Sequence, residues 1–319
     1  MKRRLLSIFS LLLLVLVLGG AVTQRQRIKD EYIVRTTDLQ PASADILTKL
    51  ALTKPAAFIY EASQPMIEPA AIFNRSCSKV TREQSIILGC YTQQKIFIYD
   101  ITDVRLSGVK EVTAAHELLH AEYERMSLSE KKKLDSELLA TVYTINDQRF
   151  KDTLAEYRRT EPDQIANELH SILGTEIEIL PTKLEEHYKK YFTNRSLIVR
   201  YTKQYEQIFT ELDATIKNYD SQLAELRNEK ELLEDSLQSQ QQSIESDKNS
   251  LELLRSSDPG AYNDQVPTYN AKIRSYNFTI NRLKQIIEQY NVLVQKRNNL
   301  AITQNDLVKQ LDSSYQPLN

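Results

Sequence analysis

Two long stretches with apolar residues at alternating steps of three and four positions constrain the fold of this chain more than any other feature. They cover residues 205–254 and 266–311 and are separated by the Ser-Ser-Asp-Pro-Gly segment 256–260. A seam of this kind is typical of long helices that pair along one face, and proline followed by glycine breaks a helix. The segment 196–313 is therefore predicted to form two long helices joined by a turn.

Arms of nearly equal length on either side of a turn favour an antiparallel coiled-coil hairpin. In this arrangement Tyr205 lies near Leu311 and Leu237 lies near Ile280. The alternative is a parallel dimer of long helices, which the central Pro-Gly pair makes less favourable. The hairpin is expected to serve for self-association or for binding a protein partner. Polar residues at seam positions can set register or oligomeric state; here they are Lys230, Gln240, Asp247, Arg297 and Gln304.

The N-terminus has the pattern of a membrane anchor. A basic start, residues 2–4, precedes the uncharged run Leu5–Val22, whose eighteen residues span about 27 Å as a helix. Residues 1–22 are predicted to be an uncleaved transmembrane signal anchor, and cleavage after Ala21 is the alternative. By the positive-inside rule, the N-terminus is cytoplasmic and the main domains lie outside the cell membrane.

The rest of the chain divides by composition. Residues 23–45 are polar and are predicted to be a stalk, and residues 46–195, which contain both cysteines and all four histidines, are predicted to be a globular domain. The hairpin at 196–313 and a short tail at 314–319 follow. The net charge is −2 and no basic clusters are interleaved with aromatic residues, so nucleic acid is excluded as a partner.

Cys77 and Cys90 are the two cysteines of the chain. In an oxidising compartment, a pair at this spacing is typical of one disulfide that closes a short loop. We therefore predict a Cys77–Cys90 disulfide. Two free buried thiols are the alternative.

A small sheet is predicted to precede the helices of the domain. Ile86–Tyr91 and Lys95–Tyr99 are β-prone runs separated by three polar residues, which indicates a hairpin. Ala57–Tyr60 is a candidate third strand. An edge strand beside a metal site can hold an extended peptide by backbone pairing. Helices are predicted at about 127–145, 147–158 and 162–173.

The pentad His116-Glu117-Leu118-Leu119-His120 is the strongest chemical signal. Histidines four residues apart project from one face of a helix, so both imidazoles can bind one metal ion. Between them, Glu117 can hold a metal-bound water and accept its proton. Neutral imidazole suits Zn²⁺. The alternative is an amphipathic helix with surface histidines, but the small and apolar neighbours favour a buried helix on which polar groups need partners.

A catalytic zinc site needs a third protein ligand and an open position for water. Glu168 lies near the centre of a helix predicted to begin at Pro162 and end before Gly174. Its helical neighbours Ile165 and Ile172 are apolar, so Glu168 is predicted to point to the packed side and to be the third ligand. The non-ligand alternative is a surface glutamate on a short amphipathic helix. The rival ligands are His170, Glu156 and Glu176.

The pentad followed by a glutamate on a later helix resembles the gluzincin branch of zinc metallopeptidases. The resemblance covers about residues 85–176, and the pentad is its specific part. It implies that His116, His120 and Glu168 bind zinc. It also implies that Glu117 is the general base. Candidates for the residue that donates a hydrogen bond to the transition state are His170, Tyr157 and Arg158.

Two functions follow from these patterns. The first is a membrane-anchored extracytoplasmic zinc metalloendopeptidase that hydrolyses a peptide or protein substrate. Its fold would be α+β: a small zincin-like domain, made of a β-hairpin and metal-bearing helices, followed by the antiparallel helical hairpin. The alternative is a non-catalytic structural or adaptor protein of the cell envelope, since an anchor and a coiled coil fit both functions. Only the pentad distinguishes them.

Overall fold

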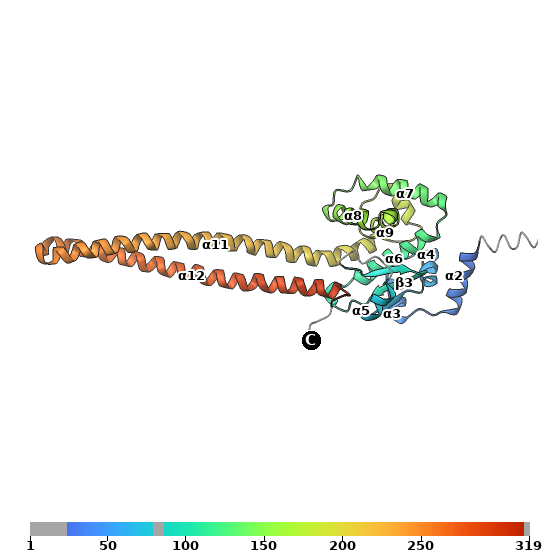
Figure 1. Cartoon of the computed structure of the whole chain (residues 1–319), viewed down its shortest axis with the longest axis horizontal. Coiled ribbons are helices and arrows are strands. Elements are labelled where there is room, and N and C mark those ends of the chain that lie inside the picture. The colour runs from blue at the N-terminus through green and yellow to red at the C-terminus, as the bar shows by residue number, and fades with distance from the viewer. Residues whose placement is uncertain (1–23, 79–85, 316–319) are drawn as a thin grey trace, which may run out of the picture. The chain divides into compact units, whose positions relative to one another are not determined.

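The computed structural model describes residues 24–78 and 86–315 (Figure 1). The chain divides into two compact units. The first comprises the residues up to Ile208 together with those from Leu307 onward, and the second comprises Phe209–Asp306. The first is a mostly helical domain with a small sheet, and the second consists of two long helices. This confirms the predicted combination of strands, short helices and a long helical hairpin.

The elements of the first unit follow one another in a mixed order. In the described part of this unit, three helices precede the sheet, one helix lies between its first two strands, and the remaining helices follow it. They are α2 (Arg25–Thr36), α3 (Pro41–Lys49), α4 (Lys54–Ala62), β1 (Met66–Glu68), α5 (Ala70–Ser76), β2 (Gly89–Thr92), β3 (Lys95–Tyr99), η1 (Val104–Leu106), α6 (Val109–Arg125), α7 (Leu128–Val142), α8 (Gln148–Thr160), η2 (Pro162–Gln164), α9 (Ile165–Thr175) and α10 (Thr182–Tyr188).

The sheet has the strand order β1-β3-β2, with β3 in the centre. β1 pairs with β3 in parallel, and β2 pairs with it antiparallel. The predicted hairpin is therefore confirmed, although β2 begins at Gly89 and not at Ile86. Its turn is Gln93-Gln94, where both residues have positive φ angles. The consequence is that β2 is an edge strand, and only its β3 side is occupied by another strand in the described part of the chain.

The prediction of a strand at Ala57–Tyr60 is wrong, because these residues lie within α4. Thr53 caps this helix: its hydroxyl accepts a hydrogen bond from the backbone N–H of Ala56. Ala56 and Tyr60, one turn apart, are both fully buried. A short apolar run fits a buried helix as well as a strand. The N-cap at Thr53 favours the helix here. The third strand is β1.

The segment predicted to be a stalk, residues 23–45, is largely folded onto the domain. α2 packs against α4, and α3 packs against α6 and β1. On α2, Asp30 is only 2 % exposed. It forms an ion pair with Arg125 at 3.0 Å. The polar composition of this segment therefore reflects pairing between helices and not an extended linker.

α6 lies at the centre of the domain and packs against α9, α4, β2 and β3. Its start is defined by Gly108, whose φ of +98° is a conformation that other residues adopt only with strain. Ala114, Ala115, Leu118 and Leu119 are completely buried. The pentad therefore lies on a buried helix, as its small and apolar neighbours indicated.

The three helices predicted after the pentad correspond to α7, α8, and η2 with α9. Gly174, however, lies inside α9 and not beyond its end. A Cβ atom at this position would lie 2.4 Å from Leu119 Cδ1 and 2.7 Å from Tyr188 Cε1. The glycine is therefore a packing residue: its missing side chain allows α9 to lie close to α6.

The second unit is formed by parts of α11 (Arg195–Ser257) and α12 (Pro259–Leu311), which run antiparallel side by side (Figure 1). Arg282 donates to Glu229 at 2.7 Å, and Gln240 donates to Thr279 at 3.2 Å. These contacts bracket the predicted Leu237–Ile280 level and confirm the antiparallel register. Further polar pairs across the two helices are Asp220–Arg297, Asp213–Gln304 and Asp247–Lys272.

The alternating spacing of apolar residues predicts Ile287 and Val308 as seam positions of α12, and the prediction is wrong at both. Ile287 and Val308 are 38 % and 40 % exposed, whereas their neighbours Ile286 and Leu307 are completely buried. A helix with 3.6 residues per turn drifts relative to a strict seven-residue repeat. Where two adjacent residues are both apolar, this drift decides which of them faces the other helix.

No helix in residues 24–78 and 86–315 is long and apolar enough to cross a membrane. The predicted anchor, residues 1–22, lies outside the described residues. Within the domain, Cys77 and Cys90 form a disulfide with a Cα–Cα distance of 6.0 Å. It links the end of α5 to β2, and both cysteines belong to a small apolar cluster with Phe73 and Phe97. The bond therefore fixes one side of the edge strand.

Candidate metal centre

Three side chains of the domain form a group that can hold a metal ion: His116, His120 and Glu168. One ligand atom from each lies within 4.8 Å of the other two. Glu168 Oε2 is 3.7 Å from His116 Nε2, and Glu168 Oε1 is 3.6 Å from His120 Nε2. Ligands of a tetrahedral zinc ion, at about 2.0–2.1 Å from the metal, lie about 3.3 Å apart. Small side-chain movements are therefore enough to bring all three onto one ion.

The helices bring these residues together for simple geometric reasons. His116 and His120 lie one turn apart on α6, with ring centroids 4.8 Å apart. Glu168 comes from α9, which packs against α6. Leu169 and Leu173 of α9 are completely buried in the core cluster that also contains Leu119 of α6. The third member of the group is thus placed by helix packing.

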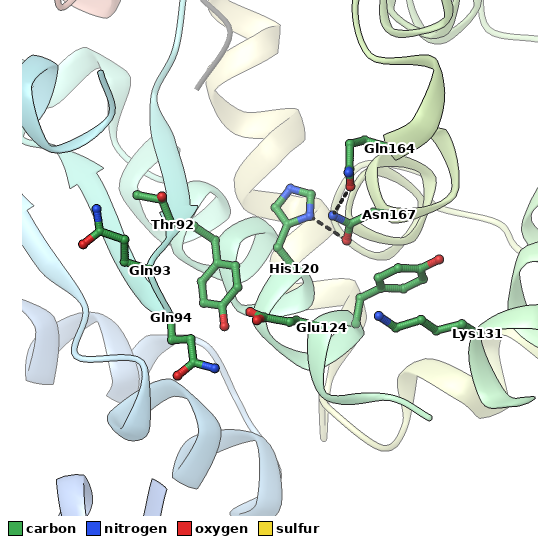
Figure 2. A pocket seen from close by; sticks show the side chains of 10 residues that line it. Thr92, Gln93, Gln94, His120, Glu124, Lys131, Gln164 and Asn167 are labelled. Carbon is green, nitrogen blue, oxygen red and sulfur yellow. Dashed lines mark hydrogen bonds between the residues drawn. The ribbon is translucent and has the colours of Figure 1, made fainter. Parts of the chain in front are cut away.

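Asn167 orients one of the histidines. Its side-chain oxygen lies 2.9 Å from His120 Nδ1, and Figure 2 shows this contact at the wall of a pocket. An amide oxygen only accepts, so Nδ1 carries the proton and Nε2 keeps its lone pair. Ser171 Oγ is also 3.3 Å from Nδ1. His120 is therefore held in the tautomer in which Nε2 can bind a metal ion.

Glu168 is held as an anion. Burial raises the pKa of its carboxyl, but the two histidines and a hydrogen bond from Tyr157 outweigh burial and lower the pKa to about 2. A carboxylate stabilised in this way is ready to bind a cation without first losing a proton. The same contact brings the Tyr157 hydroxyl to the edge of the metal group.

Glu117 is buried between α6 and β2. Burial raises the pKa of its carboxyl to about 7, with an additional contribution from the Glu168 charge, while His120 and the backbone N–H of Tyr91 oppose the rise. The Tyr91 N–H donates to this carboxyl, so the backbone of β2 reaches the pentad. A carboxyl with a pKa near neutrality is suited to accept and return a proton.

The other sequence candidates lie elsewhere. His170 is completely buried, with Nδ1 3.2 Å from the Leu119 carbonyl oxygen and Nε2 3.1 Å from His187 Nε2. Both of its ring nitrogens are thus engaged away from the metal group. Glu156 pairs with Arg159, and Glu176 pairs with Arg149. Of the three candidate hydrogen-bond donors, Tyr157 contacts Glu168, whereas Arg158 is exposed.

A polar pocket of about 390 Å³ opens beside His120 (Figure 2). One wall comes from β2 and its turn, and the other from α6, α7 and the start of α9. The lining residues are Tyr91, Thr92, Gln93, Gln94, His120, Tyr123, Glu124, Lys131, Gln164 and Asn167. The edge strand and the candidate ligand therefore share one cavity.

Comparisons with protein-family models, curated proteins and solved structures find no match to this chain. The chemistry of the site therefore rests on its own geometry.

Sequence reasoning missed the residues that support the candidate ligands. Asn167 immediately precedes Glu168, and an amide beside a ligand is a usable signal for a residue that orients a histidine. Ser171 and the backbone of Tyr91 carry no such signal, because their contacts exist only once α9 and β2 have packed against α6.

Proposed function

We propose that this protein is a zinc-dependent metalloendopeptidase of the gluzincin type, with a zincin-like catalytic domain. The observation that carries the proposal is the convergence of His116, His120 and Glu168 beside the buried carboxyl of Glu117. Two imidazoles and one carboxylate are a ligand set found in catalytic zinc sites, which keep the fourth position open for water.

In the proposed mechanism, zinc would be held by His116, His120 and Glu168. When bound, it lowers the pKa of a water molecule to about 7 and polarises the substrate carbonyl. Glu117 accepts the proton of that water and passes it to the leaving nitrogen. The Tyr157 hydroxyl, which donates to Glu168 at the edge of the group, would turn from that carboxylate to donate its hydrogen bond to the developing oxyanion.

The edge strand β2 would bind the substrate backbone. Its side facing β3 is used by the sheet, while the Tyr91 N–H on the opposite side reaches Glu117. An extended peptide can add to such an edge by main-chain hydrogen bonds. The pocket beside His120, whose lining combines amide side chains and two tyrosines with the charged Glu124 and Lys131, would then receive a neighbouring side chain of the substrate.

The remaining parts of the chain complete the proposal. Residues 1–22 would anchor the protein in the cell membrane with the domain outside the cytoplasm. The helical hairpin would bind a protein partner or a second copy, since its surface carries charges of both signs.

Zinc analysis of the purified full-length protein tests the metal first. We expect about one zinc per chain after reconstitution. Glu168→Gln should weaken zinc binding by more than about 100-fold, because changes to residues that only orient a ligand already cost about 10–100-fold. Glu156→Gln and Glu176→Gln are matched controls that should retain zinc. Absence of zinc from the wild-type protein would refute the metal centre.

Peptide cleavage then tests the chemistry. Glu117→Gln should abolish turnover while zinc stays bound, because an amide cannot accept the proton of the water. Glu111→Gln makes the same change on the same helix, at a residue that pairs with Lys49, and should keep turnover. A zinc-loaded wild type that cleaves no member of a broad peptide library would favour the non-catalytic adaptor function instead.

A further inference from the structure

We propose that α2 is a positioning element for the substrate-binding strand, with Asp30 as its central residue. α2 contacts the hairpin of β2 and β3 at two places: through Arg125 to Tyr91, and directly at the turn residue Gln94. The functional part of this inference rests on the proposed peptidase activity, whereas the clamping of the hairpin can be tested without it.

The first contact is a buried ion pair. Arg125 Nε and one terminal nitrogen each donate to a different oxygen of Asp30 at 3.0 Å. The side chains of Asp30 and Arg125 are 3 % and 11 % exposed, and Gln26 donates to Asp30 at 2.9 Å. A bidentate pair has a fixed geometry, and breaking one partner leaves a buried charge unpaired. It therefore joins α2 rigidly to the last turn of α6.

Arg125 extends this connection to the edge strand. Its other terminal nitrogen donates to the Tyr91 hydroxyl at 3.0 Å and to the Ala121 carbonyl oxygen at 2.9 Å. Tyr91 is the residue whose backbone N–H bonds to Glu117. One guanidinium thus links α2, the helix of the pentad and the strand beside it, and the position of Tyr91 depends on all three.

The second contact holds a strained turn. Gln93 and Gln94 have φ angles of +52° and +64°, the left-handed region, which is strained for a residue with a Cβ atom. The Gln94 amide donates to Gln26 at 2.9 Å, and its oxygen accepts from Lys29. Both turn residues line the pocket beside His120 (Figure 2). Contacts from α2 thus offset strain in the segment that forms one pocket wall.

The arrangement separates positioning from chemistry. None of the α2 residues belongs to the metal group, and α2 contributes no side chain to the lining of the pocket beside His120. Loosening α2 should leave metal binding intact and disturb the strand that would hold the substrate. The chain preceding α2 is the predicted membrane anchor, so the element that shapes the pocket is also the one nearest the anchor in sequence.

The test uses the zinc-loaded full-length protein with Asp30→Asn and, as a milder variant, Gln94→Ala. Glu31→Gln is the matched control, because Glu31 lies on the same helix and pairs with exposed Arg35. Hydrogen–deuterium exchange of residues 89–95 should rise about tenfold or more in Asp30→Asn, less in Gln94→Ala, and not in the control. Zinc stoichiometry should stay unchanged in all three variants.

Kinetics provide the second readout. Asp30→Asn should raise KM about tenfold or more with a smaller change in kcat, because the strand contacts bound substrate and Glu117 remains in place. Unchanged exchange in both variants, or faster exchange spread evenly over the domain, would overturn the clamp. Increased exchange at 89–95 without any wild-type cleavage would retain the clamp and reject the peptidase. Faster exchange with an unaltered KM would reject its role in substrate binding.

Discussion

Replacing Gly89 with alanine should push the edge strand away from the helix that carries the pentad. Gly89 is the first residue of β2. A Cβ atom there would lie 2.5 Å from Thr113 Cγ2, 2.8 Å from Glu117 Oε1 and 2.9 Å from Glu117 Cγ. Optimal carbon–carbon contacts lie at about 3.5–4.0 Å. Relief of the closest contact therefore requires β2 and α6 to separate by about 1 Å.

The magnitude follows from this displacement. Adding a methyl group to an interior that is already filled destabilises the folded protein by about 1–3 kcal/mol. Replacing glycine with alanine also stabilises the folded state by about 0.4–1 kcal/mol, because the unfolded chain loses conformational entropy. The free energy of unfolding should therefore fall by between about 0 and 2.6 kcal/mol. The effect on turnover should be larger, because a 1 Å misplacement in a site can cost about 100-fold. No ligand lies on β2, so zinc should stay bound.

Urea unfolding, zinc analysis and peptide cleavage measure these three effects in one variant. A second substitution separates this explanation from general damage: Thr113→Ser removes the Cγ2 methyl group, so Gly89→Ala with Thr113→Ser should recover part of the lost stability. Wild-type stability and turnover in Gly89→Ala would show that β2 does not lie as close to α6 as described. A double variant no better than the single one would show that Thr113 is not the obstacle.

Three further predictions concern other parts of the chain. Asn167→Leu should weaken zinc binding about 10–100-fold, because His120 loses the hydrogen-bond acceptor that orients it. Competition with a chromophoric chelator measures this affinity, and an unchanged value would show that Asn167 does not support the site. Burial lowers the pKa of His187 to about 4, below its ordinary 6.5, so its stabilising contribution is present above pH 6.5 and is lost as the pH falls towards 4. His187→Gln should therefore reduce the loss of stability between pH 7 and about 4.5 in urea unfolding, and parallel curves for both proteins would contradict this. Cysteines at Leu237 and Ile280 should crosslink within one chain, whereas crosslinks found only between chains would require a parallel dimer.

The pair of histidines illustrates what local geometry makes predictable. Residues four apart on a helix share a face whatever surrounds them, so His116 and His120 could be placed together from spacing alone. The disulfide and the hairpin of β2 and β3 are also short-range features, each within fifteen residues of chain. Residues so close in the chain have few other partners to choose from, so these features could be predicted.

The choice of Glu168 among the candidate third ligands could not be made from spacing along the chain alone. Its helix face could be estimated from apolar neighbours, but Glu156, Glu176 and His170 were open alternatives. The choice is made by the contact of α9 with α6, which depends on the missing side chain of Gly174 against Leu119. In that packing His170 turns to His187, while Glu168 meets the two histidines.

By itself, the sequence determined the helix of the pentad, the strands of the hairpin and the antiparallel order of the long helices. Each of these follows from a repeating pattern along the chain. Only the tertiary structure decided that α2 packs on the domain instead of forming a stalk, and that Asp30 pairs with Arg125. The two residues are 95 positions apart. Composition alone does not show whether a charged side chain is exposed to water or buried in an ion pair. That depends on which residues pack against it in the folded protein.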